Sequence, residues 1–220
     1  KKLEVNEYTP KRHLIVWQMF QDASNFMKNG TKLRQMINEL NEKDFTNSTE
    51  THEFGDMYES MLKDLQESKR DGGEFYTPRA LTDFIVEKVD PRLGEKVADF
   101  ACGTGGFLVS ALKHLTAKVQ TPEDLQLCRN NLFGIEKKSF PYSLCMTNLI
   151  LHEVDEPKIY QDNSLNKNVR ELKDNDMYDV ILMNPPYGGT EDEIIQMNFP
   201  QEFRASETAD LFMAVIMYRL

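Results

Sequence analysis

The sequence predicts an α/β fold in which an N-terminal helical block precedes a parallel β-sheet covered by helices. Short apolar runs alternate with helix-like segments from about residue 71 onward. The runs are apolar at consecutive positions, which is typical of strands buried on both faces of a parallel sheet. Residues 10–70 instead carry their apolar side chains at helical spacing. We therefore expect two domains, 1–70 and 71–220.

Three amphipathic helices are expected in the N-terminal block. A polar linker, NEKDFTNSTET, separates the second helix from the third. The three apolar stripes consist of Leu14, Trp17 and Phe20, then Leu33, Met36, Ile37 and Leu40, and then Phe54, Met57, Tyr58, Met61, Leu62 and Leu65. Stripes at this spacing are typical of core or partner-facing helices rather than of a cofactor site.

The second domain alternates strands and helices. Its first helix is expected to begin at Pro78, because proline is favoured in the first helical turn. Strands are expected at 95–101, 132–136, 158–164 (with its loop) and 177–183, and helices at 105–115, 122–130, 139–152 and 208–220. The apolar run at 179–183 would form a long exposed edge, which proteins avoid. We therefore expect the natural sheet to continue beyond Leu220, so that this Rossmann-like sheet is truncated.

Composition argues against several classes of protein. The 220-residue chain has a formal net charge of −10, which is unfavourable for gripping DNA phosphates over a broad face. No apolar run approaches the ~20 residues that cross a bilayer, and the first residues lack a signal-peptide pattern. Three widely spaced cysteines fit a reduced, cytoplasmic protein. Without HExxH or a CxxC pair, zinc chemistry has no support.

A glycine-rich turn, DFACGTGGF, follows the first strand of the sheet. Such a turn lets the backbone approach a ligand and directs the N-terminus of the next helix toward it. The dinucleotide motif G-x-G-x-x-G is absent, because Gly103, Gly105 and Gly106 are followed by Phe107. A tight turn without a ligand is the alternative. The spacing from Asp99 through the glycines instead resembles the first motif of S-adenosylmethionine-dependent methyltransferases.

Two acidic residues follow the next two strands. Glu136 and Asp162 stand at carboxyl ends of parallel strands, where α/β sheets form their ligand crevice. Glu136 can accept both hydroxyls of a ribose, and Asp162 can accept from an adenine amino group of the cofactor. In isolation, Glu136 also fits a solvated acid beside two lysines, and Asp162 fits an Asx turn.

The fourth strand ends at NPPYGG, residues 184–189. An aromatic amine is a poor methyl acceptor because its lone pair is delocalised into the ring. The side-chain oxygen of Asn184 and the carbonyl of Pro185, held by the stiff Pro185-Pro186 pair, can accept the amine hydrogens and localise that lone pair. Tyr187 can stack on a base, a contact of ~1–3 kcal/mol. The alternative is a proline-rich turn in which Tyr187 only packs.

An extended aromatic segment, GEFYTP, precedes the first helix of the second domain. Phe75, Tyr76 and Thr77 are expected to lie across the cofactor. The alternative is a hydrophobic staple ahead of a helix.

The order of these motifs resembles that of amino-methyltransferases of DNA. The segment FGDMYESMLKDLQESKRDGGEFYTPRALTDFI is similar to the modification (M) subunit of type I restriction-modification systems, with residues 50–220 as the specific part. Tyr187 stands where these subunits often carry Phe. The candidate cofactor-binding residues are Glu74, Phe75, Tyr76, Thr77, Pro78, Arg79, Asp99, Gly103, Thr104, Gly105, Gly106, Glu136 and Asp162, and the candidate catalytic residues are Asn184, Pro185, Pro186 and Tyr187.

The resemblance implies site-specific methylation of DNA at the 6-amino group of adenine, with S-adenosylmethionine as the methyl donor. The target adenine would be flipped out of the duplex. Partners would be DNA, a separate specificity (S) subunit, a second M subunit and, in some assemblies, an endonuclease (R) subunit. Because a separate S subunit would read the DNA sequence and two M subunits would share the DNA contacts, this chain could remain acidic. The helical block 1–70 would face these partners or the DNA.

Two other functions remain open on the sequence. NPPY also occurs in enzymes that methylate glutamine side-chain amides, whose nitrogen poses the same lone-pair problem. A non-catalytic assembly module could keep the fold and only dock partners, although such a module has no use for an intact NPPY segment.

Overall fold

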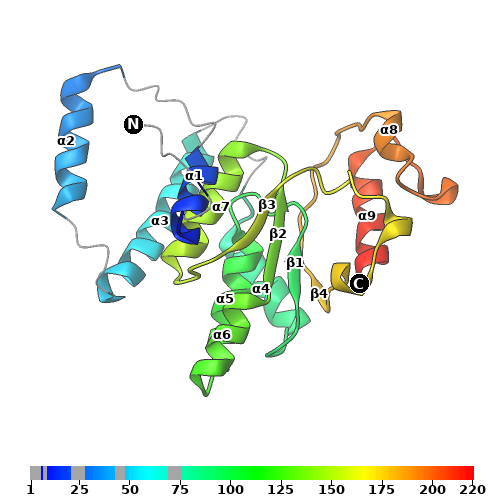
Figure 1. Cartoon of the computed structure of the whole chain (residues 1–220), viewed down its shortest axis with the longest axis horizontal. Coiled ribbons are helices and arrows are strands. Elements are labelled where there is room, and N and C mark those ends of the chain that lie inside the picture. Colours follow the sequence, from blue (N-terminus) through cyan, green and yellow to red (C-terminus); the bar gives the residue numbers. More distant parts are fainter. Residues whose placement is uncertain (1–5, 7–8, 21–27, 43–47, 69–75) are drawn as a thin grey trace.

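The computed structural model describes residues 6, 9–20, 28–42, 48–68 and 76–220 (Figure 1). A four-stranded parallel sheet lies at its centre, with the strand order β3-β2-β1-β4. The strands are β1 (Val97–Asp99), β2 (Leu132–Glu136), β3 (Lys158–Gln161) and β4 (Val180–Ile181). The predicted α/β class and the predicted order of strands along the chain are confirmed.

The strand β4 is shorter than the sequence predicts. We expected a strand over 177–183, but pairing with β1 covers only Val180 and Ile181. The backbone N–H of Tyr178 donates to the carbonyl of Arg219 at 2.9 Å instead of to a neighbouring strand. After residue 184, two consecutive prolines lack the N–H that a strand ladder requires.

Helices cover both faces of the sheet. One face is covered by α4 (Arg79–Val89), α5 (Gly106–Thr116), α6 (Pro122–Asn130) and α7 (Ser139–Leu151) (Figure 1). The other is covered by α9 (Thr208–Arg219) with the short segments α8 (Glu193–Gln196), η2 (Val169–Glu171) and η4 (Gln201–Phe203). The short segment η3 (Asp174–Asp176) contributes no buried residue. Neighbouring residues of a strand point to opposite faces. Val97 accordingly packs in the first core and Ala98 in the second, where it joins Phe199 and Leu211.

Two of the three N-terminal helices that the structure describes pack onto α7. The block consists of α1 (Lys11–Phe20), α2 (Gly30–Asn41) and α3 (Ser48–Ser68), and both α1 and α3 lie against α7. The hydroxyl of Ser143 donates to the carbonyl of Met19 at 2.8 Å, and that of Tyr58 donates to the carbonyl of Leu144 at 3.2 Å. Burial at this contact raises the pKa of Tyr58 to about 12.

The predicted stripes of the block are only partly buried. In α1, Met19 is buried, whereas the neighbouring Phe20, which belongs to the predicted stripe, is 57 % exposed. The reason is that α7 contacts the side of the helix that carries Met19. Leu62 of α3 is buried as expected. In α2 no residue is buried, and Met36, Ile37 and Leu40 remain exposed. The predicted boundary near residue 70 lies outside the described residues.

Helix α4 begins at Arg79, with Pro78 as the N-cap, one residue later than predicted. Within the described ranges, no helix is both long and apolar enough to cross a membrane.

Candidate active site

A cavity of about 320 Å³ lies at the carboxyl ends of the strands. The chain runs from β1 outward through β2 to β3, whereas β4 lies on the opposite side of β1. The loops after β1 and β4 therefore diverge, and a crevice forms between them, as is general for open α/β sheets. Residues that follow each of the four strands line this cavity.

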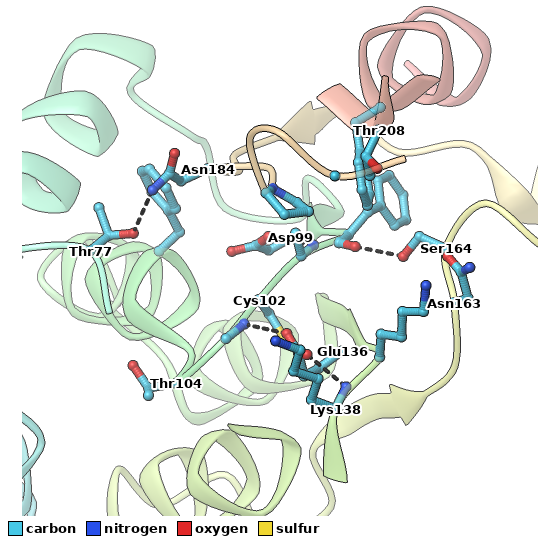
Figure 2. Close-up of a pocket in the computed structure, with 18 of the residues that line it drawn as sticks. Thr77, Asp99, Cys102, Thr104, Glu136, Lys138, Asn163, Ser164, Asn184 and Thr208 are labelled. Carbon is cyan, nitrogen blue, oxygen red and sulfur yellow. Dashed lines mark hydrogen bonds between the residues drawn. The ribbon is translucent and has the colours of Figure 1, made fainter. Parts of the chain in front are cut away.

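Most of the described candidate residues line the cavity (Figure 2). The lining candidates are Tyr76, Thr77, Asp99, Gly103, Thr104, Gly106, Glu136, Asp162, Asn184 and Pro186. The candidates Pro78, Arg79, Gly105, Pro185 and Tyr187 are described but are not among the lining residues. Glu74 and Phe75 lie outside the described residues. Motifs that are more than one hundred residues apart in the sequence, such as Thr77 and Asn184, are thus brought to one site.

The glycine turn needs its glycines for two reasons. Gly103 and Gly105 adopt positive φ values of 53° and 82°, which side-chain-bearing residues rarely adopt. A Cβ atom on Gly105 would lie 2.8 Å from the sulfur of Cys145, so the turn also packs tightly against α7. Gly105 is the N-cap of α5, and the first helical residue, Gly106, lines the cavity. The N-terminus of α5 therefore opens onto the site.

Asp99, at the end of β1, is almost completely buried, with 1 % of its surface exposed. The pKa of its carboxyl is raised to about 8, mainly by burial; a hydrogen bond from the N–H of Ala101 at 3.0 Å opposes this rise, and the nearby Glu136 carboxylate contributes to it. Asp99 therefore carries a proton at neutral pH. It lines the cavity as a neutral group that both donates and accepts hydrogen bonds.

Glu136, at the end of β2, organises the turn beside it. One of its carboxylate oxygens accepts from the N–H of Gly103 at 3.0 Å, and the other accepts from the N–H of Lys138 at 2.8 Å. The carboxylate thereby joins the loop after β1 to the loop after β2. The interpretation as a purely solvated acid is wrong for this position, because Glu136 is only 9 % exposed.

The NPPYGG segment lies on the other side of the cavity from Glu136. The amide nitrogen of Asn184 donates to the hydroxyl of Thr77 at 3.4 Å, which leaves the amide oxygen on the opposite side of the group (Figure 2). Tyr187 is 74 % exposed, so that most of the residue is accessible to solvent. Tyr187 is therefore not the buried packing residue of the alternative interpretation.

Charged and polar groups close one end of the cavity. The ammonium of Lys137 pairs with the carboxylate of Glu191 at 3.0 Å, and the side-chain amide of Asn163 reaches the other oxygen of Glu191 at 3.4 Å. Asp162 accepts from the N–H of Asn163 at 2.7 Å and from the side-chain amide of Asn166 at 2.9 Å. The Asx turn in this loop is made by Asn163, whose side-chain oxygen accepts from the N–H of Leu165 at 3.1 Å. Asp162 nevertheless lines the cavity as well.

Several lining residues were not predicted. Most of them lie within four residues of a predicted residue in the sequence, namely Phe100, Ala101, Cys102, Phe107, Lys137, Lys138, Asn163, Ser164, Gly189, Thr190 and Glu191. Thr208 and Phe212 are different, because they come from α9 and carry no local signal. A Cβ atom on Gly189 would lie 2.8 Å from the hydroxyl oxygen of Thr208, so the close approach of α9 depends on that glycine. Among the described residues, no cluster of His, Cys, Asp and Glu could hold a metal ion.

Comparison with known proteins gives consistent matches. The profile of a family described as N-6 DNA methylase matches residues 49–220. The EcoEI type I restriction enzyme methylase subunit of Escherichia coli is 51% identical over 208 residues, which cover 94% of this chain and 42% of that protein.

Solved structures of type I modification proteins also match this chain over nearly its whole length. A modification subunit assigned to a type I restriction enzyme of Vibrio vulnificus superposes with a TM-score of 0.83 at 44% identity, over 95% of this chain and 43% of the other. A chain from a study of complex assembly in a type I restriction-modification system gives 0.88 at 36% identity, over 96% and 43%. The present chain thus spans less than half the length of these relatives.

Proposed function

Since this chain belongs to the N-6 DNA methylase family, we propose that it transfers a methyl group from S-adenosylmethionine to the 6-amino group of adenine in DNA, as part of a type I modification subunit. One observation carries this proposal most directly. Asn184 and Pro186, which follow β4, line the same cavity as the glycine turn that follows β1. A cofactor on the turn and a base at NPPY would therefore meet in one space.

The residues of the cavity fit the proposed cofactor. A cavity of about 320 Å³ falls within the usual range for small-molecule sites, roughly 300–1,000 Å³. Glu136 keeps its carboxylate at the cavity wall and can accept hydrogen bonds from ribose hydroxyls. Asp162 offers a further acceptor at the same end, for an adenine amino group. The open N-terminus of α5 and the glycine backbone would hold the methionine part.

The chain's own contribution to catalysis is to position and polarise the base. S-adenosylmethionine, when bound, supplies a methyl group that is already activated by its sulfonium. Asn184 would present its amide oxygen, and Pro185 its carbonyl oxygen, to the two hydrogens of the adenine amine. Thr77 holds the nitrogen end of the Asn184 amide, so it supports this orientation. Tyr187 is exposed and can stack on the base.

The base must leave the duplex to enter such a site, at a cost of a few kcal/mol. A chain with a net charge of −10 is poorly suited to supply the phosphate contacts alone. We therefore propose that an S subunit and a second M subunit complete the DNA interface, with the helical block 1–70 contributing to assembly. An R subunit would join the assemblies that also cleave DNA.

The alternatives gain less support. Methylation of a glutamine amide would use the same NPPY chemistry, but the matching family is that of DNA methylases. A docking module without catalysis would not need an exposed Tyr187 next to a cavity that contains Asn184.

The proposal is tested in two steps. Calorimetry with S-adenosylmethionine on the full-length protein should give a saturable heat of binding, and its absence would favour a docking module. The protein, co-purified with its neighbouring subunits, should then transfer tritiated methyl groups to duplex DNA. Label that enters a glutamine-bearing protein but not adenine would overturn the DNA substrate.

A further inference from the structure

A single carboxylate joins three helices behind the cavity. Glu59, on α3, accepts from Nε and Nη2 of Arg79 at the start of α4, the second of these at 2.9 Å. The same carboxylate accepts from the side-chain amide of Asn148, on α7, at 2.6 Å. Glu59 is 12 % exposed at its side chain and does not line the cavity. It is nevertheless connected to the cavity through both partners.

The first connection runs through Asn148 to the glycine turn. The Asn148 side chain is fully buried, and its amide nitrogen donates to the carbonyl of Thr104 at 3.0 Å as well as to Glu59. Thr104 lines the cavity between the two positive-φ glycines. The position of this carbonyl therefore depends on an amide that Glu59 holds from the other side.

The second connection runs through Arg79. A Cβ atom on Gly106 would collide with Nη1 of Arg79, so the guanidinium packs directly on the first residue of α5. Its central carbon also lies 4.9 Å from the ring centre of Tyr76. Gly106 and Tyr76 both line the cavity. Arg79, a candidate cofactor contact by sequence, thus stands behind two lining residues.

The buried positions of Arg79 and Asn148 depend on the Glu59 carboxylate. Among the residues that the structure describes, Nη1 of Arg79 and the side-chain oxygen of Asn148 are buried without hydrogen-bond partners. Removing one partner of a buried ion pair leaves an uncompensated charge, which is strongly unfavourable. Without the Glu59 carboxylate, Arg79 would have to move toward solvent, away from Gly106 and Tyr76, and Asn148 would lose the partner that fixes its amide.

We propose that Glu59 is a positioning residue for cofactor binding, which holds the glycine turn through Asn148 and the Tyr76 segment through Arg79. This inference rests on the proposed function, because it assigns the cavity to S-adenosylmethionine. It makes α3 of the N-terminal block part of the cofactor site's support. Loss of the Glu59 carboxylate should loosen the turn, so that the cofactor must order it on binding.

The test compares Glu59→Gln with Asp56→Asn in the full-length protein. Asp56 lies one turn earlier on α3 and pairs with Lys113 at 3.6 Å on the exposed surface, so its variant removes the same charge from the same helix. Glu59→Gln should weaken S-adenosylmethionine binding about tenfold, which corresponds to about 1.4 kcal/mol, and Asp56→Asn should leave it unchanged. Equal affinities for wild type and Glu59→Gln would overturn the inference.

Two further readouts separate positioning from a general loss of folded protein. Glu59→Gln should raise KM for the cofactor while kcat at saturating cofactor stays near the wild-type value. A smaller folded fraction would lower kcat and leave KM unchanged, and that result would contradict a positioning role. Amide hydrogen exchange at residues 104–106, measured without cofactor, should be faster in Glu59→Gln and unchanged in Asp56→Asn.

A second variant decides the matter if Glu59→Gln does not fold. Asn148→Ala leaves the ion pair of Glu59 with Arg79 in place and removes the amide that joins Glu59 to the carbonyl of Thr104. It should also weaken cofactor binding and speed exchange at the glycine turn, and wild-type values for both would overturn the inference. A wild-type protein that binds no S-adenosylmethionine would instead overturn the proposed function itself, so the two failures are distinguishable.

Discussion

Replacing Asp99 with asparagine should remove a pH dependence of stability that the wild-type protein carries between about pH 4 and pH 8. In the folded protein, burial raises the pKa of the Asp99 carboxyl to about 8. In the unfolded chain an aspartate has a pKa of ~3.9. Between these values the folded state binds the proton and the unfolded state does not. Stability from this group is therefore complete below the unfolded pKa and is lost as the pH rises through the folded pKa.

The magnitude follows from the two pKa values. Each pKa unit corresponds to ~1.36 kcal/mol, so the interval from ~3.9 to about 8 gives an upper limit of about 6 kcal/mol. Asparagine has a similar shape, keeps an oxygen that can accept from the N–H of Ala101, and stays neutral at every pH. The Asp99→Asn variant should therefore gain stability relative to wild type as the pH rises from 5 to 8.

The assay is urea unfolding followed by circular dichroism at several pH values between 5 and 8. The quantity compared is the difference in unfolding free energy between wild type and Asp99→Asn. His152 changes stability with the opposite sign, because burial lowers its pKa and its contribution is lost as the pH falls, but it is present in both proteins and cancels. A difference that is constant across this pH range would refute the reasoning that Asp99 is protonated in the fold.

Three further predictions concern the site. Asn184→Ala should lower the rate of DNA methylation by at least ~100-fold, because it removes a preorganised acceptor, while calorimetry finds nearly unchanged cofactor affinity; turnover near the wild-type rate would remove its proposed role. Tyr187→Phe should keep the methylation activity, whereas Tyr187→Ala should lose a stacking contact of ~1–3 kcal/mol, seen in kcat/KM for DNA; equal values for both variants would contradict stacking. Gly106→Ala should lower the thermal midpoint, because its Cβ would displace the Arg79 guanidinium from its ion pair with Glu59 and overpacking costs roughly 1–3 kcal/mol, whereas Gly30→Ala, whose new Cβ meets no described atom within 4 Å, should not.

Much of the site could be predicted because it is local to strand ends. Asp99, Glu136, Asp162 and Asn184 each stand at or just after an apolar run that became a strand. The carboxyl ends of parallel strands share one edge of the sheet. Once the alternation of strands and helices is recognised, the positions of these residues in the sequence are enough to bring them together.

Other features depended on contacts that no local pattern contains. Thr208 and Phe212 line the cavity because α9 packs over the second face of the sheet, and nothing in their own segment indicates a site. The stripe of α2 has the same helical spacing as those of α1 and α3, yet none of its residues is buried. Periodicity specifies that one face of a helix is apolar, but not which surface covers it.

The sequence by itself determined the α/β class, the order of strands along the chain and the residues at the strand ends, since these follow from apolar periodicity and backbone geometry over a few residues. Only the tertiary structure decided the protonation of Asp99 and the direction in which Arg79 points. Burial sets the first, and an ion pair with Glu59, twenty residues away, sets the second. Both depend on interactions with groups that come together only when the chain folds.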